Sequence, residues 1–223
     1  MSTWIAEAAA IFAKDWRSEL RTRFALNTLG LFALTTLVVV SFALGPIGAS
    51  PLAPAVLPAV LWIILLFAAT AGLPRLFVAK EETHTATALR LTATPSALFC
   101  SKLAFGLTLI GAIELLTTPL FLILVQLRVD SPGLLVATLA IGGYGLATAS
   151  TLVATMVAQA RGKATLFAVL LFPVLVPLLI MAVALTRQAV AGEAAGVALT
   201  ELLLYDASVT VASLMLFPAM WNP

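Results

Sequence analysis

Residues Phe24–Leu44 read FALNTLGLFALTTLVVVSFAL, a continuous apolar run without a single charged side chain. A helix rises about 1.5 Å per residue, so roughly 20 apolar residues cross a hydrocarbon core of about 30 Å. This run is therefore long enough to span a membrane once. Five further apolar runs of similar or greater length follow it, at 52–73, 98–127, 133–157, 164–185 and 202–220. The sequence predicts an all-α integral membrane protein with six transmembrane helices.

The basic residues are distributed unevenly over the segments that connect these runs. Of the twelve Lys and Arg residues, only Arg128 and Arg187 follow the third or the fifth run. The others precede the first run or follow the second or the fourth: Lys14, Arg17, Arg21, Arg23, Arg75, Lys80, Arg90, Lys102, Arg161 and Lys163. Because basic residues are retained on the cytoplasmic side, both termini are predicted to be cytoplasmic. The same bias accounts for the net charge of +2 and leaves no basic patch for nucleic acid.

Composition excludes several other classes of protein. A chain that is 62% hydrophobic and 10% charged could not form the water-facing surface of a soluble monomer. A single cysteine, Cys100, excludes an intrachain disulfide, and a single histidine, His84, cannot build a two-histidine metal or haem site. Gly162-Lys163-Ala164 lacks the further residues of a phosphate-binding loop, so any ATP would be bound by another chain. We therefore expect no catalytic, cofactor-binding or metal-binding residues, and no enzymatic activity.

Residues 1–23 differ from the rest because their apolar residues are spaced rather than continuous. They recur every three or four positions, at Trp4, Ile5, Ala8, Ile11, Phe12, Trp16 and Leu20. This periodicity predicts an amphipathic helix lying in the cytoplasmic interface, with its Trp rings at headgroup depth. The alternative is a cytoplasmic extension of the first transmembrane helix. Residues 24–223 are then expected to form a single six-helix transmembrane domain.

The connection at 80–97 differs in kind from the other connections. The polar stretch Glu81–Thr85 precedes a helix-compatible stretch, Ala86–Leu91, and Thr94-Pro95 interrupts the chain before the third run. A Thr can cap the start of a helix, and Pro95 can occupy the first turn of the next one. We interpret 80–97 as a cytoplasmic docking segment for a partner, and the alternative is a mere linker. The candidate contact residues are Glu81, Glu82, Thr85, Leu89 and Arg90.

Charged residues are few inside the apolar runs, which makes each of them informative. Glu114 lies about halfway along the third run, near the bilayer midplane, where an ionised carboxylate is costly without a partner or water. It is either a proton or substrate contact, or it is protonated or hydrogen-bonded to a Thr, a Ser or Tyr144. Asp206, near the outer end of the sixth run, is a candidate to contact Arg187 or a helix N-terminus. Lys102 is close enough to the inner interface to extend its amine into it.

Two further features bear on helix geometry. Pro173 and Pro177 are four residues apart in the fifth run, so they share one face of the helix. Each removes a backbone donor and can kink the helix, and a kinked helix is a candidate hinge, although static kinks are commoner. The segment Gly142-Gly143-Tyr144-Gly145 in the fourth run allows neighbouring helices to approach closely, which we interpret as a packing feature.

Several short elements, taken in their order along the chain, resemble a known family of membrane proteins. They are Lys14–Arg21, Phe42–Pro46, Leu57–Trp62, Arg75–Glu82, Lys102, Ala160-Arg161, Leu171–Pro177, Tyr205-Asp206 and Leu216–Pro218. Together their order and spacing are similar to those of the CcmB family, also called haem exporter protein B. These are the membrane subunits of the cytochrome c maturation ABC system, and the resemblance covers nearly the whole chain.

The resemblance implies a fold like that of the type-2 ABC exporters, with 80–97 as the coupling segment. It also implies a multi-pass protein of the bacterial cytoplasmic (inner) membrane, present in two copies per complex. The implied partners are an ABC ATPase similar to CcmA, membrane proteins similar to CcmC and CcmD, and a periplasmic haem chaperone similar to CcmE. ATP bound by the ATPase would drive haem export, haem delivery or release of the haem-loaded chaperone. The alternative is a generic type-2 ABC exporter permease for a lipid, a polysaccharide or a drug.

Overall fold

The computed structural model of the chain describes residues 2–44, 52–82, 94–158 and 163–221. Within these ranges every regular element is a helix, so the prediction of an all-α fold is confirmed. The helices are α1 (Ser2–Thr22), α2 (Phe24–Leu44), α3 (Ala53–Glu82), α5 (Pro95–Leu124), α6 (Pro132–Ala158), α7 (Lys163–Ala191) and α8 (Ala198–Trp221).

Membrane-crossing length is met by five helices in the described part of the chain. These five, α3, α5, α6, α7 and α8, each contain an apolar stretch of 18 residues or more, as a multi-pass membrane protein requires. In α2 the described apolar stretch is shorter, at Gly30–Ala43, although the whole helix has 21 residues. Six crossings therefore remain a proposal for this chain.

Several helices continue beyond the apolar runs that predicted them. The α3 helix ends at Glu82 rather than near residue 73, and α7 ends at Ala191 rather than near residue 185. The length of an apolar run reflects the thickness of the hydrocarbon core. The helix itself continues into the polar interface as long as its backbone hydrogen bonds persist. The start of α5 was predicted correctly, because Pro95 occupies its first turn and Thr94 is its N-cap residue.

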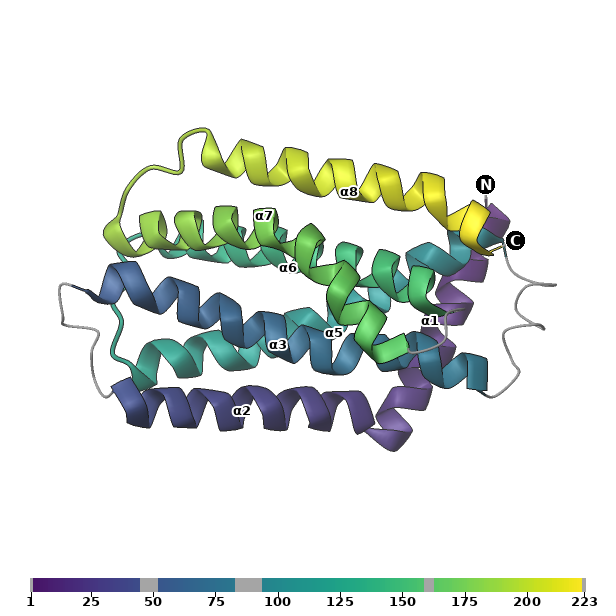
Figure 1. Cartoon of the computed structure of the whole chain (residues 1–223), viewed down its shortest axis with the longest axis horizontal. Coiled ribbons are helices and arrows are strands. Elements are labelled where there is room, and N and C mark those ends of the chain that lie inside the picture. Colours follow the sequence, from purple (N-terminus) through teal and green to yellow (C-terminus); the bar gives the residue numbers. More distant parts are fainter. Residues whose placement is uncertain (1, 45–51, 83–93, 159–162, 222–223) are drawn as a thin grey trace.

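The six helices from α2 to α8 run side by side as a bundle, as Figure 1 shows. The central member is α6, which packs against α3, α5, α7 and α8. Of the apolar stretch of α6, 67% is buried, whereas α8 lies along the edge of the bundle and has only 17% of its stretch buried. Any polar residue on α6 is therefore surrounded by other helices, which makes this helix the natural place to look for a site.

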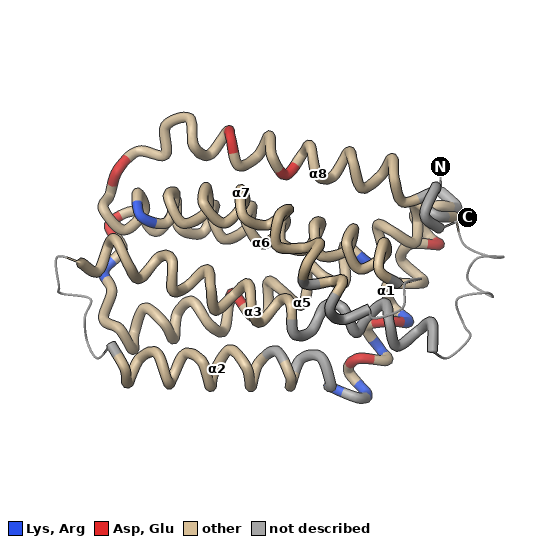
Figure 2. Tube along the Cα trace, in the orientation of Figure 1, with Lys and Arg blue, Asp and Glu red and all other residues tan. Residues whose placement is uncertain are grey.

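The first helix, α1, does not belong to the bundle but crosses its end (Figure 1). The chain turns a corner between α1 and α2 at Arg23, whose φ of 51° lies in the left-handed region and interrupts the helix. The alternative of α1 as a straight extension of the first transmembrane helix is therefore wrong. Both chain termini lie at this same end, and Figure 2 shows Lys and Arg residues along α1 there.

At the far end of the bundle two connections are tied together. The backbone N–H of Ser131, just before α6, donates to the carbonyl of Ala189 in α7 at 2.9 Å. Gly192, with φ of 70°, lies so close to Asp130 that an added Cβ would be 3.0 Å from the Cβ of that residue. Only glycine combines this left-handed backbone with so close an approach. The start of α6 and the end of α7 are thereby fixed to one another.

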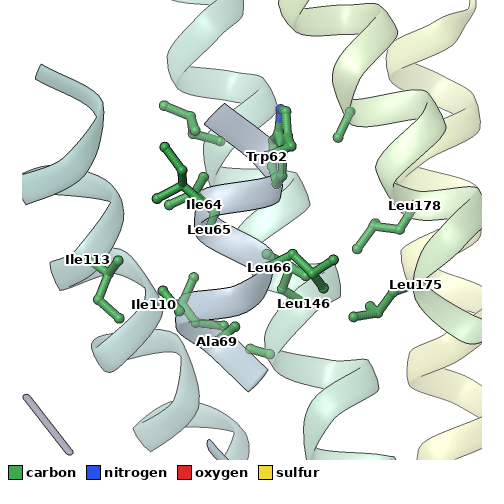
Figure 3. Packing of buried hydrophobic residues seen from close by; sticks show 14 of the residues in the cluster. Trp62, Ile64, Leu65, Leu66, Ala69, Ile110, Ile113, Leu146, Leu175 and Leu178 are labelled. Carbon is green, nitrogen blue, oxygen red and sulfur yellow. The ribbon is translucent and has the colours of Figure 1, made fainter. Parts of the chain in front are cut away.

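The apolar core between α3, α5, α6 and α7 is closely packed, and Figure 3 shows its side chains. Leu175 and Leu178 of α7 are fully buried opposite Leu146 of α6. Trp62 of α3 is also fully buried, and its indole Nε1 donates to the Thr186 hydroxyl at 2.8 Å. A polar group in hydrocarbon is costly unless it is hydrogen-bonded, so this bond allows Trp62 to lie in the core.

Candidate functional site

The Gly142–Gly145 segment of α6 is where the polar residues of the bundle meet. At three of its four positions the space that a Cβ would occupy is taken by a large side chain of another helix. The three pairs are Gly142 with Trp62 of α3, Gly143 with Glu114 of α5, and Gly145 with Asp206 of α8. At Gly143, for example, an added Cβ would lie 2.5 Å from Oε1 of Glu114. The interpretation of this segment as a packing feature is supported, and the groups that pack there include two carboxylates.

Helix geometry places the two carboxylates on opposite sides of α6. Successive residues are about 100° apart and rise about 1.5 Å, so Gly143 and Gly145 face roughly opposite directions at nearly the same depth. Glu114 lies ten residues before the end of α5 at Leu124, a distance of about 15 Å along the helix. This is half of a hydrocarbon core of about 30 Å. In a bilayer that covers the bundle, Glu114 and Asp206 would flank α6 near the midplane.

Asp206 is buried without a partner. Its side chain is 2% exposed, and neither carboxylate oxygen has a hydrogen-bond partner among the residues that the structure describes. The predicted contact with Arg187 or a helix N-terminus is therefore wrong. Asp206 is one of the residues around a pocket of about 410 Å³ between α6 and α8, together with Ile141, Tyr144, Leu203, Ala207, Thr210 and Val211. An ionised carboxylate in such an apolar setting is costly, so protonation, water or another molecule must compensate it.

Glu114 also lacks the hydrogen bond that was expected as one alternative. In the described part of the chain, its Oε1 is buried and has no hydrogen-bond partner. The Tyr144 hydroxyl, a candidate partner, instead pairs with the Thr210 hydroxyl of α8 at 3.0 Å. The neighbour of the carboxylate is the backbone of Gly143, where the missing side chain leaves room for it. The roles of Glu114 as a proton contact, a substrate contact or a protonated structural group all stay open.

The two prolines lie inside α7, one turn apart, as the sequence indicated. Figure 1 shows that α7 bends along its length. Between the two prolines, the carbonyl of Val174 accepts a hydrogen bond from the Tyr205 hydroxyl of α8. Tyr205 is the residue before Asp206, so this bond links the edge helix to the proline-containing segment. A hinge at Pro173 and Pro177 stays a prediction.

A second polar cluster joins α1 to the beginning of α5. Asp15 of α1 and Lys102 of α5 form a salt bridge of 2.6 Å, and both side chains are almost fully buried. The amine of Lys102 thus lies against α1, and its extension into the interface stays a prediction. Phe12 and Trp16 of α1 stack on each other and meet Phe105 of α5 edge-on beside this pair.

The N-terminal half of α1 forms hydrogen bonds with the residues at which α5 begins. Glu7 accepts hydrogen bonds from the backbone N–H of Thr94 at 2.7 Å and from its hydroxyl at 3.1 Å. The indole N–H of Trp4 donates to the Ser96 hydroxyl at 3.0 Å. The apolar periodicity of residues 1–23 does not reveal this role of Glu7. A signal was available, because Glu7, Ile11 and Asp15 are spaced four apart and therefore share one helix face.

The predicted docking residues lie at the end of α3 and in the segment that follows it. Glu81 and Glu82 are the last two residues of α3, and their side chains are not described. Thr85, Leu89 and Arg90 lie outside the described residues. The docking function of 80–97 therefore stays a prediction, with its C-terminal part, from Thr94, held by α1.

Two comparisons with known proteins bear on the whole chain. A family model described as CcmB protein matches residues 6–221. The chain is also 30% identical over 185 residues to a protein of Bradyrhizobium diazoefficiens named heme exporter protein B. That alignment covers 82% of this chain and 82% of the relative.

Proposed function

The chain belongs to the CcmB protein family, and from this membership we propose that it is the membrane subunit of a haem-exporting ABC transporter for cytochrome c maturation. The observation that carries the proposal is the match of the family model from residue 6 to residue 221. It includes α1, the bundle and the connections between them, rather than one shared motif. The apolar bundle of membrane-crossing length agrees with such a role.

We propose further that the chain crosses the bacterial inner membrane six times with both termini in the cytoplasm. All 21 residues of α2 would form the first crossing, since a helix of this length is about 32 Å long. Ten of the twelve Lys and Arg residues would then lie on the cytoplasmic side. With Cys100 replaced, single cysteines at Ser18 and Thr85 should react only with reagents that reach the cytoplasm. Cysteines at Ser131 and Glu193 should react from outside, and the reverse result would overturn this orientation.

The energy would come from a separate ATPase subunit similar to CcmA, docked at 80–97. The contacts of α1 support a mechanical role for this segment, because Glu7 holds Thr94 and Trp4 holds Ser96. A displacement of the docking segment would therefore act on α5 and α1 together. The Leu89→Pro variant should lose co-purification with the ATPase and coupled ATP hydrolysis while it still inserts into the membrane.

The remaining partners follow from the family proposal. They would be membrane proteins similar to CcmC and CcmD and a periplasmic haem chaperone similar to CcmE, with two copies of this chain per complex. Haem would be the ligand that the complex handles, and ATP would be bound by the ATPase. We propose that this chain transmits conformational change and does not ligate haem iron.

The test is a deletion of the gene followed by separate measurement of b-type and c-type cytochromes. We expect b-type cytochromes to remain and mature c-type cytochromes to disappear, with haem accumulating on the chaperone if the transporter drives its release. A plasmid copy of the gene should restore the c-type cytochromes. Normal levels of mature c-type cytochromes in the deletion strain, with no second copy present, would reject this function and favour an exporter of a lipid, a polysaccharide or a drug.

A further inference from the structure

The acidic and the basic residues of α1 differ in exposure. Glu7 and Asp15 are used for contacts with Thr94 and Lys102 of the α5 region. Glu19, the third acidic residue of α1, is also buried. The basic residues are exposed instead, at Lys14, Arg17 and Arg21. A helix with mixed charges in its sequence therefore presents a positive surface on its outside.

These three basic residues form one stripe. At about 100° per residue, Lys14, Arg17 and Arg21 fall within about 60° of each other around the helix axis. The centre of the stripe is roughly opposite to the face that carries Asp15 and Glu19. We call Lys14, Arg17 and Arg21 the basic stripe of α1.

A third side of α1 is apolar and exposed. Ile5 is 58% exposed and Leu20 is 48% exposed. With Ala9 they occupy a flank between the buried face and the basic stripe, at about 100° to 160° when Trp4 is placed at zero. The α1 helix crosses the end of the bundle (Figure 1), and the flank and the stripe are neighbouring sectors of its surface by helix geometry. An exposed apolar flank beside a basic stripe is the arrangement of a helix that lies in a membrane interface.

We propose that α1 is a binding surface for anionic phospholipids, with the basic stripe holding their phosphate groups and the Ile5–Leu20 flank contacting their acyl chains. The positive charge of the stripe fits an anionic group, and the adjacent apolar flank fits the hydrocarbon that only a lipid brings with it. An acidic protein surface would satisfy the stripe but would leave the flank exposed. The inference does not depend on what the transporter carries.

The experiment compares lipid selectivity of the full-length chain in vesicles of phosphatidylcholine and phosphatidylglycerol. Brominated forms of each lipid quench the fluorescence of tryptophan, and Trp4 and Trp16 lie on α1 itself. The test variant is Lys14→Gln with Arg17→Gln and Arg21→Gln. The matched control is Arg128→Gln with Arg187→Gln, which removes exposed charges at the other end of the bundle. A second control, Arg17→Lys with Arg21→Lys, keeps the charge.

We expect the wild-type chain and both controls to prefer phosphatidylglycerol, and the test variant to lose that preference, by roughly fivefold for each basic residue removed. High salt should weaken the preference, whereas free inorganic phosphate at low concentration should not compete. Equal quenching by the two lipids in the wild-type chain would overturn the proposal. So would a test variant that keeps its lipid preference but no longer co-purifies with the ATPase, since the stripe would then bind a protein. Loss of c-type cytochromes plays no part in either outcome, so the proposed function is tested separately.

Discussion

Charged residues lie inside the molecule in two regions. They form a pair in one region, and in the other their buried carboxylate oxygens have no hydrogen-bond partner among the described residues. Where α1 meets α5, Asp15 and Lys102 neutralise each other at 2.6 Å. Around the glycines of α6, Glu114 and Asp206 have buried carboxylate oxygens without a hydrogen-bond partner in the part of the chain that the structure describes. Asp15 and Lys102 are each 6% exposed and Asp206 is 2% exposed, so a difference in exposure does not explain why Asp206 has no partner among the described residues. In the first region the charges are compensated within the chain. In the second region the compensation of the carboxylates depends on a proton, water or another molecule.

This comparison separates stability from function. A paired charge in a low-dielectric setting fixes two elements to each other, and removing one partner leaves the other uncompensated. An unpaired carboxylate contributes little to holding the bundle together, since it has no bond to lose. We therefore expect substitutions in the first region to change the amount of folded protein, and conservative substitutions in the second to leave it unchanged.

The largest effect is expected at the buried pair. Lys102→Met removes the charge that lies 2.6 Å from the buried Asp15 carboxylate and should destabilise the protein by about 3–5 kcal/mol. Asp15→Asn combined with Lys102→Met removes both charges and should be less destabilising than Lys102→Met alone. Thermal unfolding of the detergent-solubilised protein and its abundance in membranes measure both effects. If the double variant were at least as unstable as the single one, the pair would not be what holds α1 in place.

A smaller effect is expected at the glycines of α6. In Gly142→Ala the new methyl group meets the ring of Trp62, which is buried and hydrogen-bonded to Thr186 and cannot move aside. Overpacking of this kind should cost about 1–3 kcal/mol in the free energy of unfolding. Gly111→Ala in α5 is the matched control, because no atom lies within 4 Å of the added Cβ. Equal stabilities for the two variants would show that the close approach at Gly142 is unimportant.

The smallest effect is expected when the unpaired carboxylates are replaced by amides of the same shape. Glu114→Gln and Asp206→Asn lose no hydrogen bond that the structure describes, so each should change stability by less than about 1.5 kcal/mol. Glu114→Lys places a basic group beside Gly143 and should impair assembly. Abundance, thermal unfolding and cytochrome c maturation should be measured for each variant. Normal abundance with lost maturation in Glu114→Gln would assign Glu114 to a proton or substrate contact.

Much of the fold could be predicted from the sequence because bilayer thickness sets a length that apolar runs must meet. The bounds of α2 agree with its run, and Pro95 marks the start of α5 because its ring suits a first helical turn. The corner at Arg23 could not be predicted in this way. Its left-handed φ is uncommon for a residue with a side chain, and no local pattern in the sequence predicts it.

The residues of the candidate site could be predicted from the sequence, but their contacts could not. Glu114 and Asp206 stand out because charges are rare inside apolar runs. What surrounds them depends on which helices become neighbours, and the two glycines beside them come from a different helix. Similarly, Lys102 and Asp15 are 87 residues apart in the sequence, so their pairing follows only from the path of α1 across the bundle. Hydropathy and periodicity describe one helix at a time, and these contacts are properties of pairs.

The bond between Ser131 and Ala189 has a mechanical consequence. It joins α6 and α7 at the end of the bundle far from α1, so these helices cannot separate there without breaking it. At the end near α1 the same two helices are consecutive in the chain, since α6 ends at Ala158 and α7 begins at Lys163. The pair is therefore held together at both ends and should tilt as one unit. The α6 helix has 27 residues and is about 40 Å long. A tilt of the pair by about 5° about the end at Ser131 and Ala189 would move its other end by roughly 3.5 Å, a displacement as large as an atomic contact.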